Sequence, residues 1–347
     1  MTQDESVIIV PGARTRVHRN DRSLAVRAAL STGDFIRTKP LATFGAVLIL
    51  LMVLAALFAP FVSRYEPTRV FTAHNPEFDE ELYQKSLTDP TIRIQNIDHP
   101  EKLNPGEVNR TLEGPSAAHW LGTDTHAQDL WSRIIYGSRL SLFVGIGASL
   151  IAAFIGTITG IISGYFGGKV DMFVQRGTDA LFAFPPLVLL LLIVQVVNTP
   201  NMYWITLALG ILGISQVVRI VRSSVLSARE EQYILAAQTI GASDSRIMMR
   251  HILPNIVAPL IVIFTIAIGA YILAEAGLAF IGFGDPTAIS WGKMVDEGRQ
   301  QGTSSPLYAL FTGLAITFSV LGFNLFGDGL RDVLDPRLRG RGGRPGF

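Results

Sequence analysis

Residues 256–274 read IVAPLIVIFTIAIGAYILA, a run of apolar residues without a single charged side chain. A helix needs about 20 apolar residues to cross the hydrocarbon core of a bilayer, so this run predicts a transmembrane span. Uncharged stretches that approach or reach the same length occur at residues 40–62, 140–163, 180–197, 203–218 and 307–327. The sequence therefore predicts an all-α polytopic membrane protein with six transmembrane helices.

The composition supports a membrane protein and argues against other classes. Of the 347 residues, 49% are hydrophobic and 16% are charged, whereas an ordinary soluble domain has about 25% charged residues. The net charge of +1 provides no overall field to attract nucleic acid. Cysteine is absent, and no two histidines stand at H-x-x-x-H spacing, so we expect no disulfide, no metal site and no cysteine nucleophile.

The basic residues predict the orientation. Six spans place both termini on one side, together with two of the connecting loops. The segments on that side carry nineteen Lys and Arg, and the short loops on the other side, 198–202 and 284–306, carry two. By the positive-inside rule, the basic side is the cytoplasm. We therefore expect a multi-pass protein of the cytoplasmic membrane with both termini in the cytoplasm.

The spans divide the chain into segments. Residues 1–39 are expected to form a cytoplasmic tail with an interfacial helix, 63–138 a net acidic extracytoplasmic segment, and 329–347 a cytoplasmic tail. The first span covers 40–62, and the core, 139–330, is predicted to hold five more spans and a cytoplasmic loop. These are spans 139–164, 179–197, 203–226, 256–283 and 307–328, with the loop at 227–255.

Two local patterns concern helix shape and packing. Pro185 and Pro186, near the start of the third span, should kink or open that helix. Gly156, Gly160 and Gly164 are four residues apart, a spacing that lets helix backbones approach closely in lipid. We favour packing within the chain over a dedicated dimer motif.

The loop between the fourth and fifth spans includes residues 232–255, QYILAAQTIGASDSRIMMRHILPN. It predicts two short helices with exposed apolar residues. Gly241 permits a sharp exit from the first helix, Ser243 can cap the second, and Pro254 should end the second. An exposed apolar patch usually marks a protein contact. The alternative is a hairpin packed on its own transmembrane bundle.

The loop pattern resembles the "EAA" loop of ABC importer permeases, except that Leu235 stands where the family usually has an acidic residue. In that family, the loop forms a coupling helix that docks in a groove of the ATP-hydrolysing subunit. The resemblance implies that ATPase coupling involves Tyr233, Ala236, Ala237, Gly241, Arg246, Ile247, His251, Leu253 and Pro254.

Three further stretches resemble the C subunit of dipeptide and oligopeptide permeases. The first is HWLGTD at 119–124, followed by SRIIYGSRLSL at 132–142. The second is EAGLAFIGFG at 275–284 with SWGKM at 290–294, and the third is NLFGDGLRDVLDPR at 324–337. The resemblance implies a type I ABC importer permease fold with an enlarged extracytoplasmic loop after the first span. Residues 66–116 exceed the length expected for the family and have no assigned role.

The expected partners follow from the same resemblance. The nearest approach to a phosphate-binding loop, GYFGGKV at 164–170, lacks the required spacing and ends in valine. ATP and Mg²⁺ should therefore be bound by partner subunits, and the chain itself should not be an enzyme. The family implies a second permease subunit, two ATPase subunits or domains, an extracytoplasmic solute-binding protein, and the inner membrane of a prokaryote. The implied cargo is a peptide, with nickel chelates, glutathione or another small solute as alternatives.

Four polar residues within the spans are candidates for a substrate pathway, and each could equally bond between helices: Gln195, Gln216, Glu275 and Asn324. A local pair with Lys293 is an alternative for Glu275. Asp179 is expected to be an interface residue.

Other functional classes meet specific objections. An intramembrane protease needs a Ser–His pair or paired aspartates within the spans, and no histidine lies in any predicted span. An ion-coupled secondary transporter usually shows internal repeats, and we find no convincing one. A receptor or scaffold that uses residues 233–254 is compatible with the composition but not with the ordered motifs.

Overall fold

The computed structural model describes residues 36–74, 107–197, 201–302 and 305–334. The chain divides after Pro40, and the second unit, Leu41–Phe347, holds the elements discussed below. Nearly all of these elements are helices, which confirms the all-α class. Within the described ranges, the strands are two three-residue segments, Thr72–His74 (β1) and Glu107–Asn109 (β2), which pair antiparallel. The predicted interfacial helix and much of the 66–116 segment fall outside the described residues.

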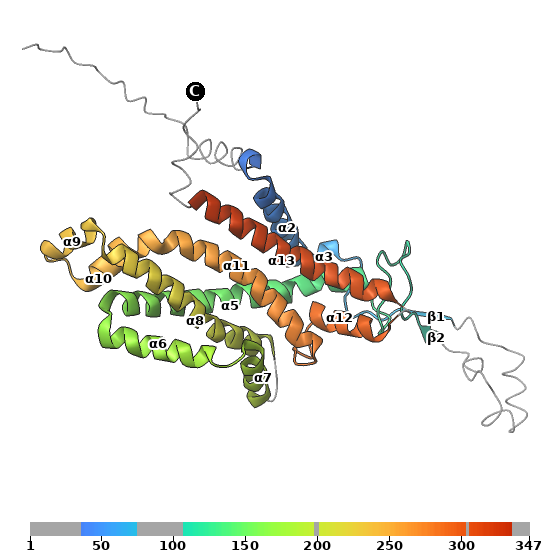
Figure 1. Cartoon of the computed structure of the whole chain (residues 1–347). Helices are drawn as coiled ribbons and strands as arrows, with labels where there is room; N and C mark the ends of the chain where they lie inside the picture. Colours follow the sequence, from blue (N-terminus) through green and yellow to red (C-terminus); the bar gives the residue numbers. More distant parts are fainter. Residues whose placement is uncertain (1–35, 75–106, 198–200, 303–304, 335–347) are drawn as a thin grey trace, which may run out of the picture. The chain divides into compact units, whose positions relative to one another are not determined.

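The helices follow one another along most of the described chain. Their bounds are α2 Pro40–Leu57, α3 Ala59–Val62, α5 Leu130–Phe166, α6 Gly168–Phe182, α7 Pro186–Val197, α8 Met202–Arg229, α9 Gln232–Thr239, α10 Asp244–Ile247, a π-helical turn Met248–Ile252, α11 Leu253–Phe280, α12 Trp291–Gln300 and α13 Pro306–Leu334. α9 and α10 lie at one end of the helical bundle, and β1, β2 and α12 lie toward the opposite end (Figure 1).

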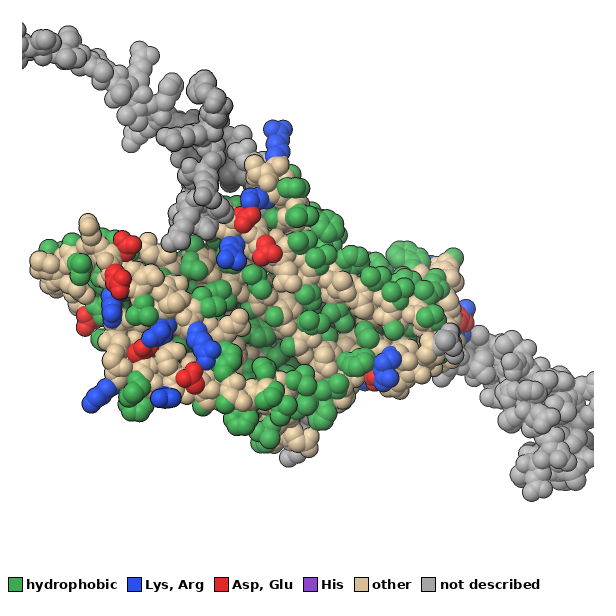
Figure 2. Space-filling view, in the orientation of Figure 1, with side chains coloured by type: hydrophobic (Ala, Val, Ile, Leu, Met, Phe, Trp, Pro, Cys, Tyr) green, Lys and Arg blue, Asp and Glu red, His purple; other side chains and the backbone are tan. Residues whose placement is uncertain are grey.

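Five of the described helices are long and apolar enough to cross a membrane: α2, α5, α8, the continuous helix from Asp244 to Phe280, and α13. The bent pair α6–α7 makes a sixth if it crosses as one span. On the face shown in Figure 2, charged side chains lie mainly over the left part and the upper edge, with a few near the right end, and the stretch between them shows hydrophobic and other uncharged groups. This distribution is that of a multi-pass membrane protein.

The third span differs from the single helix predicted at 179–197. The chain bends by 85° between α6 and α7, at the residues just before Pro186. A proline lacks the N–H that would continue the helical ladder and clashes with the preceding turn, so the predicted kink is confirmed. α6 lies against α8, where both carboxylate oxygens of Asp171 accept hydrogen bonds of 2.5 Å from the Arg222 guanidinium.

The helices next to the predicted extracytoplasmic segment, 63–138, and within the 284–306 loop also differ from their predicted bounds. α5 begins nine residues before the predicted residue 139, because the Asp129 carboxylate accepts a hydrogen bond from the backbone N–H of Ser132 and caps the helix there. The predicted 284–306 loop contains α12, which buries Trp291 and Met294. The indole N–H of Trp291 donates to the carbonyl of Ile134, at 2.9 Å.

The remaining helix ends differ by smaller amounts. α11 ends at Phe280, three residues before the predicted end of the fifth span, and Gly282 follows with a φ of +87° that terminates the helix. α13 continues to Leu334, six residues beyond the predicted end of the sixth span. A run of apolar residues predicts only the part of a helix that lies within the bilayer, so the polar turns that continue the helix beyond the bilayer are missed.

Gly156, Gly160 and Gly164 pack against another helix of the same chain, as the sequence predicts. A Cβ atom added to Gly156 would lie 2.6 Å from the Cβ of Val217 on α8, and one added to Gly160 would lie 2.7 Å from the Cβ of Val221. Gly164 faces Val225 in the same way. α5 and α8 therefore approach closely along three successive turns, and this pair forms the centre of the bundle.

Asp285 connects the turn after α11 to the start of α8. Its carboxylate accepts hydrogen bonds from the backbone N–H of Met202 at 3.0 Å and from the hydroxyl of Thr287 at 2.7 Å. Burial raises the pKa of this carboxyl, but the hydrogen bonds from Thr287 and from backbone N–H groups outweigh it, so the pKa lies below its ordinary value.

We expect Asp285→Ala to lower the free energy of unfolding by about 2 kcal/mol at pH 7, the typical contribution of hydrogen bonds to a charged group. Because the folded-state pKa is depressed, Asp285 stabilises the fold above about pH 4, and this stabilisation disappears as the pH falls through the folded pKa. Thermal unfolding of both proteins in detergent, measured from pH 7 downward, checks this. A difference that grows toward low pH would contradict it.

Candidate functional site

The segment between α8 and α11 forms a helical hairpin at one end of the bundle (Figure 1). α9 follows α8 after a short turn, and α10 continues through the π-helical turn into α11. The hairpin is thus covalently continuous with two of the long helices. A force applied to α9 and α10 therefore acts on α8 and α11 directly.

Gly241 forms the turn between α9 and α10. Its φ of +79° lies in the left-handed region, which non-glycine residues rarely adopt. The N–H of Gly241 donates to the carbonyl of Gln238, and the N–H of Ala242 donates to that of Ala237. This pair of bonds is a Schellman motif. The predicted sharp exit at Gly241 is confirmed.

One face of the hairpin is anchored to the bundle. Ile234, Ile247 and Ile252 are fully buried and belong to a cluster that includes Tyr165 on α5 and Val225 on α8. The phenol of Tyr165 donates a hydrogen bond of 2.7 Å to the Asp244 carboxylate. The anchored face fixes the orientation of the hairpin relative to α5 and α8.

The opposite face exposes large apolar side chains. Ile240 is 84% exposed and Met249 63% exposed. Leu235 and Tyr233 are also exposed. Exposed apolar patches usually mark a site of interaction with a protein or a membrane. The hairpin packs on its own bundle with one face, as the alternative interpretation predicts, and presents exposed apolar residues with the other; a contact of that exposed face with a partner stays a prediction.

The predicted coupling residues divide between the two faces. Tyr233, Ala236, Gly241, Arg246 and Pro254 are exposed, and His251 and Leu253 are half-buried. Ala237 and Ile247 are buried, so they anchor the hairpin and cannot contact a partner. Leu235, Ile240 and Met249 are exposed apolar residues that the predicted set omits. Their hydrophobicity was visible in the sequence, but the face on which they lie was not.

Pro254 does not end the second helix as predicted. Asp244–Phe280 is continuous, and the π-helical turn absorbs the proline: the N–H of Leu253 donates to the carbonyl of Met248, five residues earlier. A wider turn removes the clash that a proline ring makes with the preceding turn of an α-helix. Ser243 occupies the N-cap position of α10, but its side chain accepts no capping hydrogen bond.

Tyr233 is tied to the base of the hairpin. Its hydroxyl accepts a hydrogen bond of 3.1 Å from the side-chain amide of Asn255, which also donates to the carbonyl of His251. Partial burial raises the pKa of the Tyr233 phenol, and the nearby charge of Glu231 raises it further. Tyr233 is therefore uncharged at neutral pH, in keeping with the apolar face it joins.

The four candidates for a substrate pathway do not converge. They lie on four different helices, α7, α8, α11 and α13, and among the described residues no hydrogen bond joins two of them, which is the sense in which they do not form one cluster. Glu275 is buried and accepts a hydrogen bond of 2.8 Å from the hydroxyl of Ser290, rather than pairing with Lys293. Gln216 lines a cavity of about 170 Å³ between α8 and α11, together with Tyr271. Asp179 forms an exposed ion pair with Arg219.

One cluster has the residue types of a metal site. Asp124, His126 and Glu297 place ligand-type atoms within 4.8 Å of one another. Asp124, however, already forms an ion pair with Arg133, and its second oxygen accepts two backbone N–H groups. A guanidinium already balances the charge at this point, which disfavours a second cation.

The Tyr165–Asp244 hydrogen bond should hold the hairpin against the bundle. Tyr165→Phe removes the bond, and we expect about 1 kcal/mol less resistance to local opening of α10. Trypsin cleavage after Arg246 or Arg250 should then be about fivefold faster. Ser223→Ala is the matched control, because that hydroxyl bonds only within its own helix. Equal cleavage rates in all three proteins would contradict the anchoring role.

The membrane-crossing bundle and its exposed hairpin fit a transport permease of the type I ABC importer class. Residues 156–340 match the family described as "Binding-protein-dependent transport system inner membrane component", and residues 36–85 match "N-terminal TM domain of oligopeptide transport permease C". The chain belongs to the family of binding-protein-dependent transport system inner membrane components. This membership decides against the intramembrane protease, the ion-coupled transporter and the scaffold.

Individual relatives agree with the family. The chain is 44% identical to a dipeptide transport system permease protein of Alkalihalophilus pseudofirmus. The aligned region of 229 residues covers 66% of this chain and 75% of the relative. The chain is 35% identical over 304 residues to an oligopeptide transport system permease protein of Bacillus subtilis. This alignment covers 87% of the chain and 88% of the relative. A glutathione transport system permease protein of Pectobacterium atrosepticum is 42% identical over 234 residues. This alignment covers 67% of the chain and 77% of the relative.

Proposed function

We propose that this permease imports di- or oligopeptides, delivered by an extracytoplasmic solute-binding protein, at the expense of ATP hydrolysed by separate subunits. Dipeptide and oligopeptide permeases among the relatives support a peptide cargo. The glutathione permease among the relatives makes glutathione the alternative cargo. Nickel chelates and other small solutes stay alternatives from the family resemblance alone. The chain itself is proposed to carry no catalytic group, since its nearest approach to a phosphate-binding loop lacks the required spacing.

The observation that carries the proposal is the two-faced hairpin. Its exposed apolar face, centred on Ile240 and Leu235, is suited to a groove on an ATPase subunit. Its other face is anchored through Ile234 and Ile247. A contact of this kind moves as a rigid body and transmits its displacement to α8 and α11. ATP and Mg²⁺ would be bound on two such partner subunits or domains.

The proposed orientation places the hairpin in the cytoplasm. Lys169, Arg222, Arg246 and Arg250 all lie on α6, the hairpin or the adjacent end of α8, and cytoplasmic segments are enriched in such residues. Both termini would then be cytoplasmic. The segments that precede α5 and the region of α12 would face the solute-binding protein. A second permease subunit would complete the pathway, since one chain supplies one wall.

A reconstituted transporter tests this function. The chain is co-purified with its ATPase, permease and binding-protein partners and placed in liposomes, and uptake of a labelled tripeptide is measured with and without ATP. We expect ATP-dependent uptake that an excess of unlabelled peptide suppresses. Uptake of glutathione or a nickel chelate in preference to peptides would favour the alternative, and uptake driven by an ion gradient without ATP would contradict the proposal.

A further inference from the structure

Arg139 lies at the start of the predicted second span, beside an apolar groove between α2 and α5. The groove has a volume of about 670 Å³. Apart from Arg139, its walls are apolar, and they include Val53 and Leu57 on α2 and Phe143, Ile146 and Leu150 on α5. A permanently charged side chain thus adjoins a channel suited to hydrocarbon.

A missing backbone donor accounts for part of the position of Arg139. The carbonyl of Ala56, in the last turn of α2, would normally accept the N–H of the residue four positions later. That residue is Pro60, which has no N–H. The Nε atom of Arg139 supplies the donor instead, at 2.7 Å. This bond uses one of the five N–H donors of the guanidinium.

The remaining donors of Arg139 are available. Its two terminal nitrogens make no hydrogen bond or ion pair within the described part of the chain, and its Cζ atom lies over the Tyr136 ring, 5.0 Å from the ring centroid. A guanidinium stays charged at any physiological pH and matches the geometry of a phosphate group. At the boundary of the membrane, the anion that is always present is the phosphate of a phospholipid. A headgroup with a net negative charge, such as phosphatidylglycerol, pairs with the guanidinium more strongly than phosphatidylcholine, whose choline cation offsets the phosphate charge.

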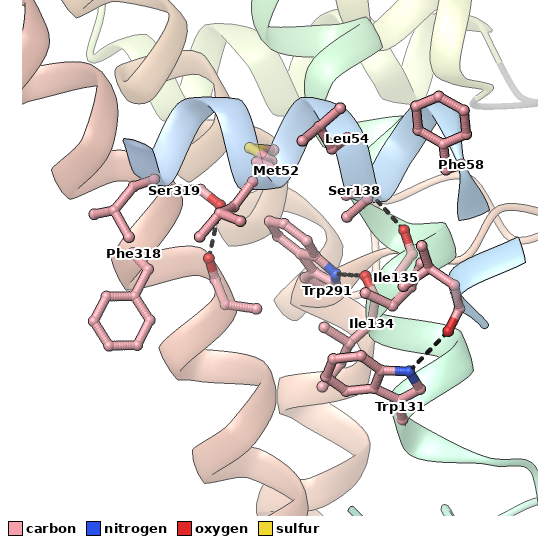
Figure 3. A pocket seen from close by; sticks show the side chains of 15 residues that line it. Met52, Leu54, Phe58, Trp131, Ile134, Ile135, Ser138, Trp291, Phe318 and Ser319 are labelled. Atoms are coloured by element: carbon pink, nitrogen blue, oxygen red, sulfur yellow. Dashed lines mark hydrogen bonds between the residues drawn. The ribbon is translucent and has the colours of Figure 1, made fainter. Parts of the chain in front are cut away.

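A second, larger groove provides the comparison. It lies between α2, α5 and α13, has a volume of about 730 Å³ and is shown in Figure 3. Its polar groups are already bonded: the indole N–H of Trp131 donates to the carbonyl of Val62, and that of Trp291 to the carbonyl of Ile134. Nothing in that groove selects a headgroup, whereas the groove at Arg139 combines an apolar wall with an unused cationic donor.

We propose that the groove between α2 and α5 binds one anionic phospholipid, with its phosphate on the terminal nitrogens of Arg139 and an acyl chain along Phe143, Ile146 and Leu150. The lipid would join the end of α2 to α5. A water-soluble anion would leave the apolar wall uncovered, and an apolar helix of another subunit would leave the guanidinium unpaired.

Native mass spectrometry of the full-length protein in a mild detergent tests this, with phosphatidylglycerol and phosphatidylcholine as probes. We expect Arg139→Gln to weaken phosphatidylglycerol binding about tenfold and to reduce the preference for it over phosphatidylcholine, as loss of a charge-assisted hydrogen bond predicts. Ile146→Trp, which fills the groove, should weaken both lipids equally. Arg69→Gln, which alters an arginine outside the groove, is the matched control.

The ratio of the two lipid affinities separates headgroup binding from the structural role of Arg139 at Ala56, because a less stable fold would weaken both lipids together. An unchanged ratio in Arg139→Gln would overturn the proposal. A photo-reactive side chain at Phe143 provides the second readout in native membranes. Labelling of phospholipid is expected, and labelling of a second permease subunit would make the groove a protein interface and overturn the proposal.

Discussion

Replacing Ile240 by aspartate is expected to abolish ATP-driven transport while the permease stays folded in the membrane. Ile240 is 84% exposed, so the substitution disturbs no internal packing. In the proposed complex, the same side chain is buried against an ATPase subunit, where an unpaired charge is costly. A hot-spot residue at the centre of an interface contributes about 2 kcal/mol or more, and if Ile240 is one, its loss corresponds to a loss of affinity of about 30-fold or greater.

Transport and co-purification of the ATPase subunits should therefore fall together in Ile240→Asp. Ser227→Asp is the matched control: it introduces the same charge at an exposed position on α8, outside the hairpin. We expect Ser227→Asp to keep at least half of the wild-type transport. Full transport by Ile240→Asp would show that the exposed face of the hairpin makes no essential contact.

The second large effect concerns stability rather than coupling. Gly160→Leu is expected to prevent accumulation of the folded protein. A Cβ at this position would lie 2.7 Å from the Cβ of Val221 and 3.0 Å from the carbonyl oxygen of Val218. A backbone carbonyl cannot move aside without separating α5 from α8, so the cost should exceed the 1–3 kcal/mol typical of overpacking. Membrane-fraction yield and thermal unfolding in detergent measure the effect.

A matched glycine distinguishes crowding from a general intolerance of larger residues. Gly177, on α6, is also helical, and a Cβ added there meets nothing within 4 Å. Gly177→Leu should therefore give a near-normal yield. The double variant Gly160→Ala with Val221→Ala should recover only a small part of the stability that Gly160→Ala alone loses, because it removes the Cγ1 methyl that lies 2.8 Å from the added Cβ but keeps the Cβ of residue 221. Equal losses at Gly160 and Gly177 would contradict close packing of α5 on α8.

Much of the architecture is encoded locally and could be predicted. The apolar run at 256–274 and the prolines at 185 and 186 act through hydropathy and backbone chemistry alone. α12 was missed because a ten-residue helix with only one buried face has no long apolar run. Its position depends on contacts distant in sequence, such as the Trp291–Ile134 hydrogen bond.

The candidate site was predicted in location but not in detail. The sequence places the hairpin between two spans and its turn at Gly241. It does not distinguish Ala237, which is buried, from Ala236, which is exposed, because both alanines fit a short helix and only tertiary packing decides which faces the bundle. The partner of Glu275 was missed for a similar reason, since Ser290 reaches it only after the chain turns back beyond α11.

The most direct test of the central claim is cysteine cross-linking of the assembled transporter. The chain contains no cysteine, so a single introduced cysteine reports one position. With Ile240→Cys, a short bifunctional reagent is expected to join the permease to an ATPase subunit, whereas Trp120→Cys, also exposed and located in the predicted extracytoplasmic segment, should give no such product. An ATPase cross-link from position 120 and none from position 240 would contradict docking through the hairpin.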